Sequence, residues 1–303
     1  MIKRWWDRFW FAPEPPVNLA AARIIFALHA LWVLLSRDLA ATANLPQPFW
    51  THVGWSDQWR FLEFPGHGGL EHALQMVAVL ALVGVTLGYR PRLTSLIAAV
   101  LLYHLAPFET IYVHQDPLER GFTMSVLALT VLAFAPCADV WSVTNRAARP
   151  KIERPAWEYR WALMLVQLFV AQIYLFAGYS KLLLVGPQWM FATNQRLWFL
   201  YFSQIDQDIV FSGFARFFAD HLWLCGLVGI GAIALDLGFI LVLVWPRSRR
   251  VIIPLAVLFH LGILFTDNIF FINLPQLLIF VNWDWLVRRW ADPGSRVTGP
   301  QAV

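Results

Sequence analysis

The sequence is poor in charge. Asp, Glu, Lys and Arg make up 14% of its 303 residues, whereas soluble domains carry about 25%. Apolar residues reach 59% and the mean hydropathy is +0.56, and several stretches near the length needed to cross a bilayer carry few charges. These values exclude an ordinary soluble domain and predict a polytopic membrane protein.

Cysteine and recognisable cofactor motifs are also scarce. The only two cysteines, Cys137 and Cys225, fall near opposite faces of the expected topology, so they predict neither a disulfide framework nor a cysteine metal site. We find no nucleotide-binding motif, haem motif or phosphate loop, and no internal repeat of the kind common in transporters. The basic start lacks an uninterrupted apolar core before its prolines, so we expect an uncleaved first span.

The apolar stretches predict an all-α helical bundle. About eight spans are expected, at residues 17–36, 72–89, 93–108, 119–137, 158–183, 220–245, 251–266 and 269–286. Sixteen of the 23 basic residues fall at the N-terminus, in alternate loops or in the tail, which predicts that both termini are cytoplasmic. The net charge of +4 is therefore explained by basic residues on the cytoplasmic side of the membrane, and we expect no nucleic-acid partner.

Three segments follow from this pattern. Residues 1–16 are rich in Trp and Phe and predict an interfacial helix. Residues 17–286 form a single transmembrane domain, and residues 287–303 a short cytoplasmic tail. Two aromatic outer loops, 37–71 and 184–219, either anchor in the membrane interface or form a lid over an outward-facing cavity.

Ionisable residues inside the spans are costly and usually have a purpose. Arg23 in the first span and Asp236 in the sixth both lie towards the inner side. We expect a structural buried pair between them, because pairing would neutralise two expensive charges, with a proton path as the alternative. A second set lies towards the outer surface on several segments: His29, His104, His114, Lys181 and His260. No HxxxH or HxH spacing accompanies these histidines, so we expect no metal.

Lys181 is the only lysine inside an apolar stretch, in a chain with three lysines and twenty arginines. Arginine stays protonated in proteins, whereas a desolvated lysine can lose its proton near neutral pH and act as a general base. The alternative is that Lys181 extends its amine to the outer interface.

Several motifs resemble one family. The stretch "FAGYSKL" (176–182), followed by Trp189, is similar to a segment of the vitamin K-dependent gamma-glutamyl carboxylase and its bacterial HTTM (horizontally transferred transmembrane) relatives. "CADVWSV" (137–143), the Pro-rich opening from residue 11 and the "ALDLGF" to "FHLGILF" region also match, and together they cover most of residues 11–285.

The resemblance implies roles and a location. Lys181 matches the lysine that deprotonates vitamin K hydroquinone, the reduced quinone cofactor expected here. His260 matches a span histidine of the family, and Trp189, Tyr179, His29 and His104 are candidate cofactor-binding groups. An ungapped match places Gly121 where the carboxylase has another functional histidine, and His114 lies seven residues too early. The resemblance also implies a bacterial inner (cytoplasmic) membrane.

Three hypotheses remain open at this point. The first is a quinol- and oxygen-dependent, carboxylase- or epoxidase-like membrane enzyme, with Lys181, His260 and His114 as catalytic residues in an outward-facing pocket. The carboxylase has a large lumenal domain after its spans, whereas only residues 287–303 follow the last expected span in this sequence. We therefore expect a small peptide, a partner-delivered protein or a free quinol as substrate on the outer side. The second is a non-catalytic maturation or export partner of a secreted peptide, and the third a small-solute transporter.

Overall fold

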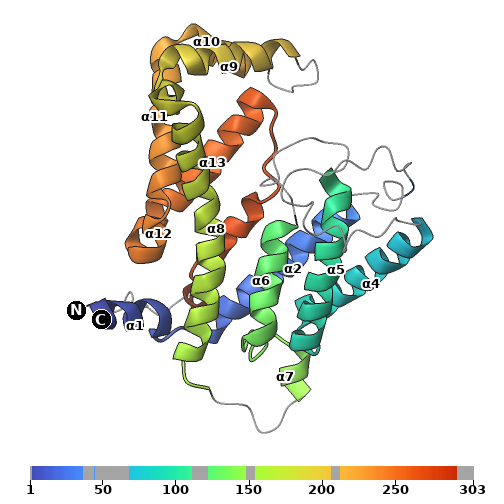
Figure 1. The fold of residues 1–303 in the computed structure, drawn as a ribbon. Helices are drawn as coiled ribbons and strands as arrows, with labels where there is room; N and C mark the ends of the chain where they lie inside the picture. The colour runs from blue at the N-terminus through green and yellow to red at the C-terminus, as the bar shows by residue number, and fades with distance from the viewer. Residues whose placement is uncertain are drawn as a thin grey trace. The chain divides into compact units, whose positions relative to one another are not determined.

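The computed structural model describes residues 2–36, 44, 68–110, 122–147, 154–205 and 212–291, and all regular structure in these ranges is helical. The chain divides into two compact units (Figure 1). The first unit comprises residues 1–166 and 281–303, and the second comprises residues 167–280. The predicted division at residues 16 and 286 stays a prediction.

The first unit is built around four packed helices: α2 (Pro16–Leu35), α4 (Gly68–Leu87), α5 (Pro91–Thr110) and α6 (Thr123–Phe134). Helix α4 packs against α2 and α5, and α6 packs against α5 and α2. Helix α2 begins at Pro16 because proline suits the first helical position, where its missing N–H leaves no bond unmade. The unit also contains α1 (Ile2–Phe11), α7 (Val143–Ala147), the start of α8 (Trp157–Leu184) and α14 (Trp283–Ala291).

Arg23 is fully buried in the first unit. Its guanidinium donates hydrogen bonds to the carbonyl oxygens of Val85 (3.0 Å) and Trp141 (2.7 Å), joining α2 to the end of α4 and to the turn after α6. Gly88, with φ of +67°, follows α4, and a Cβ there would collide with the guanidinium. Asp236 has Lys181 as its partner in the second unit, so the structure gives both residues other partners than the predicted Arg23–Asp236 pair. A carbonyl near the end of α4 and one in the turn after α6 thus accept hydrogen bonds from Arg23.

The second unit contains the rest of α8 and most of the remaining helices. They are η4 (Gly186–Met190), α9 (Ala192–Ile205), α10 (Ser212–Asp220), α11 (Leu222–Gly238), α12 (Leu241–Val244), η5 (Pro246–Ser248), α13 (Arg249–Asp267) and η6 (Leu274–Phe280). Helices α10 and α11 meet at His221 with a bend of 102°. Helices α9 and α10 pack together across the end of α11 (Figure 1).

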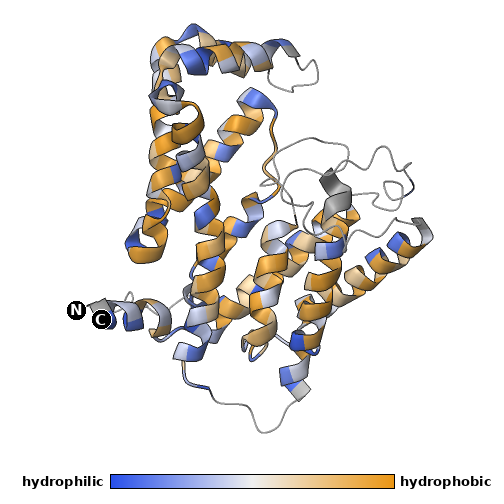
Figure 2. Cartoon of the chain, viewed as in Figure 1, coloured by the Kyte–Doolittle hydropathy of each residue, from blue (hydrophilic) through white to orange (hydrophobic). Residues whose placement is uncertain are grey.

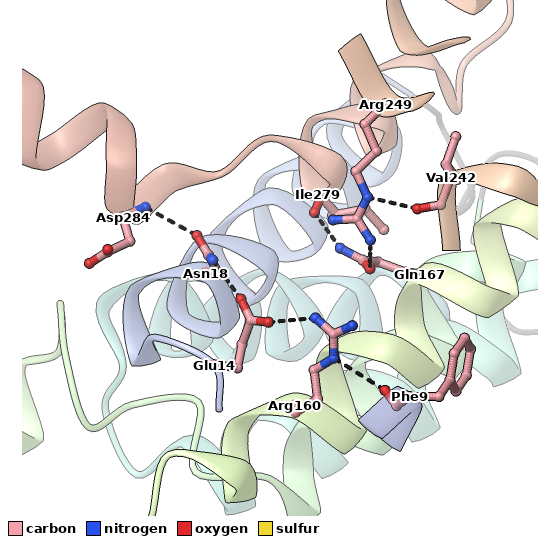
Figure 3. A network of polar contacts seen from close by, with 9 residues as sticks. All are labelled: Phe9, Glu14, Asn18, Arg160, Gln167, Val242, Arg249, Ile279 and Asp284. Carbon is pink, nitrogen blue, oxygen red and sulfur yellow. Dashed lines mark hydrogen bonds and ion pairs between the residues drawn. The ribbon is translucent and has the colours of Figure 1, made fainter. Parts of the chain in front are cut away.

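In each unit, one arginine donates hydrogen bonds both to a backbone carbonyl and to a side-chain oxygen (Figure 3). In the first unit, Arg160 donates to the carboxylate of Glu14 at 2.7 Å and to the carbonyl of Phe9. In the second unit, Arg249 donates to the carbonyl of Val242 at 2.7 Å and to the side-chain oxygen of Gln167 at 3.0 Å. These bonds need several N–H groups at fixed angles, which a guanidinium supplies and an ammonium does not.

Apolar residues dominate the long helices, and hydrophilic residues gather near their ends (Figure 2). In the described ranges, four helices are long and apolar enough to cross a membrane, and a fifth span is added if α10 and α11 count as one bent span. The four are α2, α4, α8 and the stretch Pro246–Asp267, which contains η5 and α13. The apolar part of α5, Pro91–Ala106, and α6 are shorter.

The predicted last span, 269–286, is wrong as a single helix. The chain turns at Asn268 in the left-handed region (φ 54°), forms the 3-10 helix η6, and begins α14 only at Trp283. Pro275 has no N–H to donate, and the side chain of Asn282 accepts the backbone N–H of Trp285 and so caps α14. Apolar composition alone did not reveal these breaks.

Candidate functional site

Lys181 and Asp236 form an ion pair in the second unit. The Lys181 Nζ lies 2.5 Å from Asp236 Oδ2, joining the end of α8 to the end of α11. The aspartate side chain is 3% exposed and the lysine side chain 23% exposed. The carboxylate is therefore almost completely desolvated, while the amine retains access to the surface of the unit.

Gly178 permits the close approach that makes this pair. A Cβ built at Gly178 would lie 2.8 Å from Asp236 Cβ and 2.9 Å from Leu237 Cδ2. Real side chains do not reach such distances, so only glycine fits between α8 and α11 at this level. Small residues at helix interfaces serve the same purpose widely in membrane proteins.

Trp189 lies beside the Lys181 amine. The Nζ is 5.5 Å from the centre of the indole ring, within the range of a cation–π interaction. The short 3-10 helix η4, which follows α8 directly, carries Trp189 into this position, and η4 packs against α11. The indole Nε1 is buried and has no hydrogen-bond partner among the described residues.

A second polar contact joins α8 to α13. The Tyr174 hydroxyl lies 2.8 Å from His260 Nε2. The Tyr174 ring stacks on Phe239 with centroids 3.9 Å apart and planes 6° apart, and the His260 ring lies 4.3 Å from that of Phe271. The other imidazole nitrogen of His260, Nδ1, is buried without a hydrogen-bond partner in the described part of the chain.

Tyr174, Gly178 and Lys181 share one face of α8, since residues at i, i+4 and i+7 line up along a helix. The structure thus gathers Lys181, His260, Trp189 and Asp236 in one unit. Sequence reasoning missed Tyr174 and Gly178 as members of the site, although their spacing from Lys181 was a readable signal.

The other predicted site residues have different surroundings. His29 contacts the Ser125 hydroxyl at 3.1 Å, and His104 pairs with the fully buried Glu71 at 3.1 Å, both in the first unit. Tyr179 is 55% exposed on α8. His114 lies outside the described residues, so its role stays a prediction. Within the described ranges, no group of three or more His, Cys, Asp and Glu side chains could hold a metal ion.

Apolar helices of spanning length, with a Lys–Asp pair whose carboxylate is buried, indicate a helical membrane protein with a polar site among its helices. Comparison with family models identifies which one: the HTTM domain matches residues 11–285, and the chain belongs to that family. The matched range includes every residue of the site described above. Comparisons with curated proteins and with solved structures find no match.

Proposed function

We propose that this chain is an integral enzyme of the inner membrane, with about eight spans, the last of them broken rather than a single helix, and both termini in the cytoplasm. It uses a reduced quinone and oxygen for proton abstraction and carboxylation at an outward-facing pocket, with Lys181 as its base. The Lys181–Asp236 pair carries this proposal. A lysine held beside a desolvated carboxylate and an indole ring has an environment suited to proton transfer.

Asp236 is the partner that lets Lys181 work as a base. An amine accepts a proton only when it is neutral, and Asp236 lies close enough to take the ammonium proton directly. Two separated charges are expensive in a medium of low dielectric constant, so the neutral pair of amine and carboxylic acid is accessible there. The free amine can then accept the hydroxyl proton of a hydroquinone.

The residues around the amine suit such a cofactor. Sites for small ligands are mostly apolar, with a few polar groups that fix orientation. The rings of Phe271 and Trp189, both partly exposed, supply apolar surface. The buried Nε1 of Trp189 and Nδ1 of His260 are polar atoms left for ring oxygens, with no partner among the described residues. When bound, a reduced quinone with oxygen and carbon dioxide would convert a glutamyl side chain to its gamma-carboxylated form, leaving the quinone epoxide and water.

The test is epoxide formation by the purified protein in lipid nanodiscs, supplied with reduced naphthoquinone, oxygen, carbon dioxide and a glutamyl peptide. Lys181→Arg should retain the ion pair with Asp236 but cannot be deprotonated, so the rate should fall by about 10²–10⁴. Lys3→Met, on the exposed surface of α1, is the control and should retain the rate. An unchanged rate in Lys181→Arg removes Lys181 as the base.

The same ion pair supports a second candidate, a non-catalytic maturation or export partner of a secreted peptide. In that case the Lys181–Asp236 pair serves only to hold α8 against α11. The wild type would then form no epoxide, and Lys181→Arg would support peptide maturation as well as the wild type does. The arginine variant therefore separates a proton-transfer role from a structural one.

A further inference from the structure

One hydrogen bond joins Tyr174 to His260, and its direction depends on which ring nitrogen of His260 carries the proton. A neutral imidazole has one N–H donor and one acceptor nitrogen, while a phenol hydroxyl can donate or accept. The hydroxyl lies 2.8 Å from His260 Nε2, and Nδ1 is buried without a partner among the described residues. The direction of this bond therefore decides what His260 offers at Nδ1.

The number of buried polar groups left without a hydrogen bond shows which of the two residues donates. If Nε2 carried the proton and donated to Tyr174, the tyrosine proton would have no acceptor among the contacts of the described chain, and the Nδ1 lone pair would also be unused. If Tyr174 donates to Nε2, only the Nδ1–H remains unsatisfied. Each buried polar group without a partner is costly, so the second arrangement is favoured. Phenol is also the stronger acid of the two, which makes it the natural donor.

The surrounding rings fix this arrangement. Tyr174 is 8% exposed and stacked on Phe239, so its ring has little freedom to swing the hydroxyl elsewhere. His260 is held between the rings of Tyr174 and Phe271. The Nδ1–H of His260 is buried among aromatic rings and needs a hydrogen-bond acceptor, which an oxygen on a flat ring ligand would supply.

We propose that Tyr174 is a positioning residue that holds His260 as the Nδ1–H tautomer, so that His260 donates a hydrogen bond to a ring oxygen of the ligand bound near Lys181. The identity of that ligand as a quinone rests on the proposed function. The tautomer itself does not, because it follows from contacts within the chain. Lys181 would receive the proton of one ring hydroxyl, and His260 would stabilise negative charge developing on a ring oxygen.

The first arm of the test measures the tautomer by nitrogen-15 NMR of the full-length protein carrying labelled histidine. Comparison with His260→Gln identifies the His260 signals among the eight histidines. The wild type should show a protonated Nδ1 and an unprotonated Nε2, and Tyr174→Phe should shift His260 to the Nε2–H form. Tyr201→Phe, an exposed tyrosine of α9, is the matched control and should leave the His260 signals unchanged. A wild-type Nε2–H signal, or an unchanged spectrum in Tyr174→Phe, overturns the assignment.

The second arm measures binding of menadione, a 1,4-naphthoquinone, and of 2-methylnaphthalene, which has the same rings without oxygens. Tyr174→Phe should weaken menadione binding about tenfold, equivalent to 1.4 kcal/mol, because one hydrogen bond to a ring oxygen is lost. Binding of 2-methylnaphthalene, which has no oxygen to accept that bond, should change by less than about twofold. Equal weakening of both ligands means that Tyr174 only packs, which overturns the proposal. If the wild type binds no menadione, the quinone function fails, and the NMR arm alone then decides the role of Tyr174.

Discussion

Removing Lys181 alone should destabilise the protein more than removing both partners of the Lys181–Asp236 pair. At 2.5 Å the two charges attract each other by about 7 kcal/mol at an effective dielectric constant of about 20. Desolvation offsets much of this, since each ion gives up several kcal/mol of hydration. The net contribution of the pair is therefore small, but a single stranded charge is expensive.

The two single variants should differ because the two side chains differ in burial. Lys181→Met strands a carboxylate that is 3% exposed, and should destabilise the protein by about 3–5 kcal/mol. Asp236→Asn leaves an amine that is 23% exposed and an amide oxygen that can still accept from it, so about 1–2 kcal/mol is expected. The double variant should cost less than the sum of the singles by about 2–3 kcal/mol.

The measurement is equilibrium unfolding of the purified protein in mixed detergent micelles, followed by circular dichroism for all four members of the cycle. Asp284→Asn is the control, because the Arg288–Asp284 pair has a 68% exposed arginine and should contribute under about 1 kcal/mol. A coupling energy below about 0.5 kcal/mol, or a larger loss in Asp236→Asn than in Lys181→Met, would refute the reasoning.

Two further predictions concern packing and burial. Gly178→Ala should destabilise the protein by about 1–3 kcal/mol, because its Cβ would lie 2.8 Å from Asp236 Cβ; Gly231→Ala, with nothing within 4 Å, should be neutral or stabilising in the same unfolding assay. Burial raises the pKa of Cys137, in the turn after α6, to about 11, so little thiolate is present at neutral pH. Maleimide should therefore label Cys137 far more slowly in the folded protein than in the unfolded chain, and the labelling rate should rise as the pH approaches about 11. Rapid labelling of Cys137 in the folded protein at pH 7 would contradict this.

Sequence reasoning identified the residues of the site better than their partners. Lys181 stood out because a lone lysine in an apolar stretch needs an explanation, and Asp236 stood out for the same reason. Their pairing was missed because estimated depth along idealised spans placed Asp236 near Arg23. Depth could not show that the carbonyls of Val85 and Trp141 would accept hydrogen bonds from Arg23, or that Gly178 would allow α11 to approach α8.

The fold was predictable where helices are long and uninterrupted. The expected spans 17–36, 72–89 and 158–183 agree closely with α2, α4 and α8. Agreement fails at 269–286, where a proline and capping asparagines outweigh apolar composition. Tyr174 escaped notice because a tyrosine in a membrane helix is ordinary. Its spacing from Lys181 was the one signal in the sequence, and its contact with His260 marks it in the structure.

The guanidinium contacts of Arg23, Arg160 and Arg249 bear on how the molecule can be probed. Arginine makes these internal contacts, and the sequence contains three lysines. Of the two lysines in the described ranges, Lys181 is the one inside a long apolar helix. An amine-selective reagent therefore has few other side chains to react with besides Lys181. Acylation kinetics at that nitrogen, with and without added ligand, would report occupancy of the site without any introduced label.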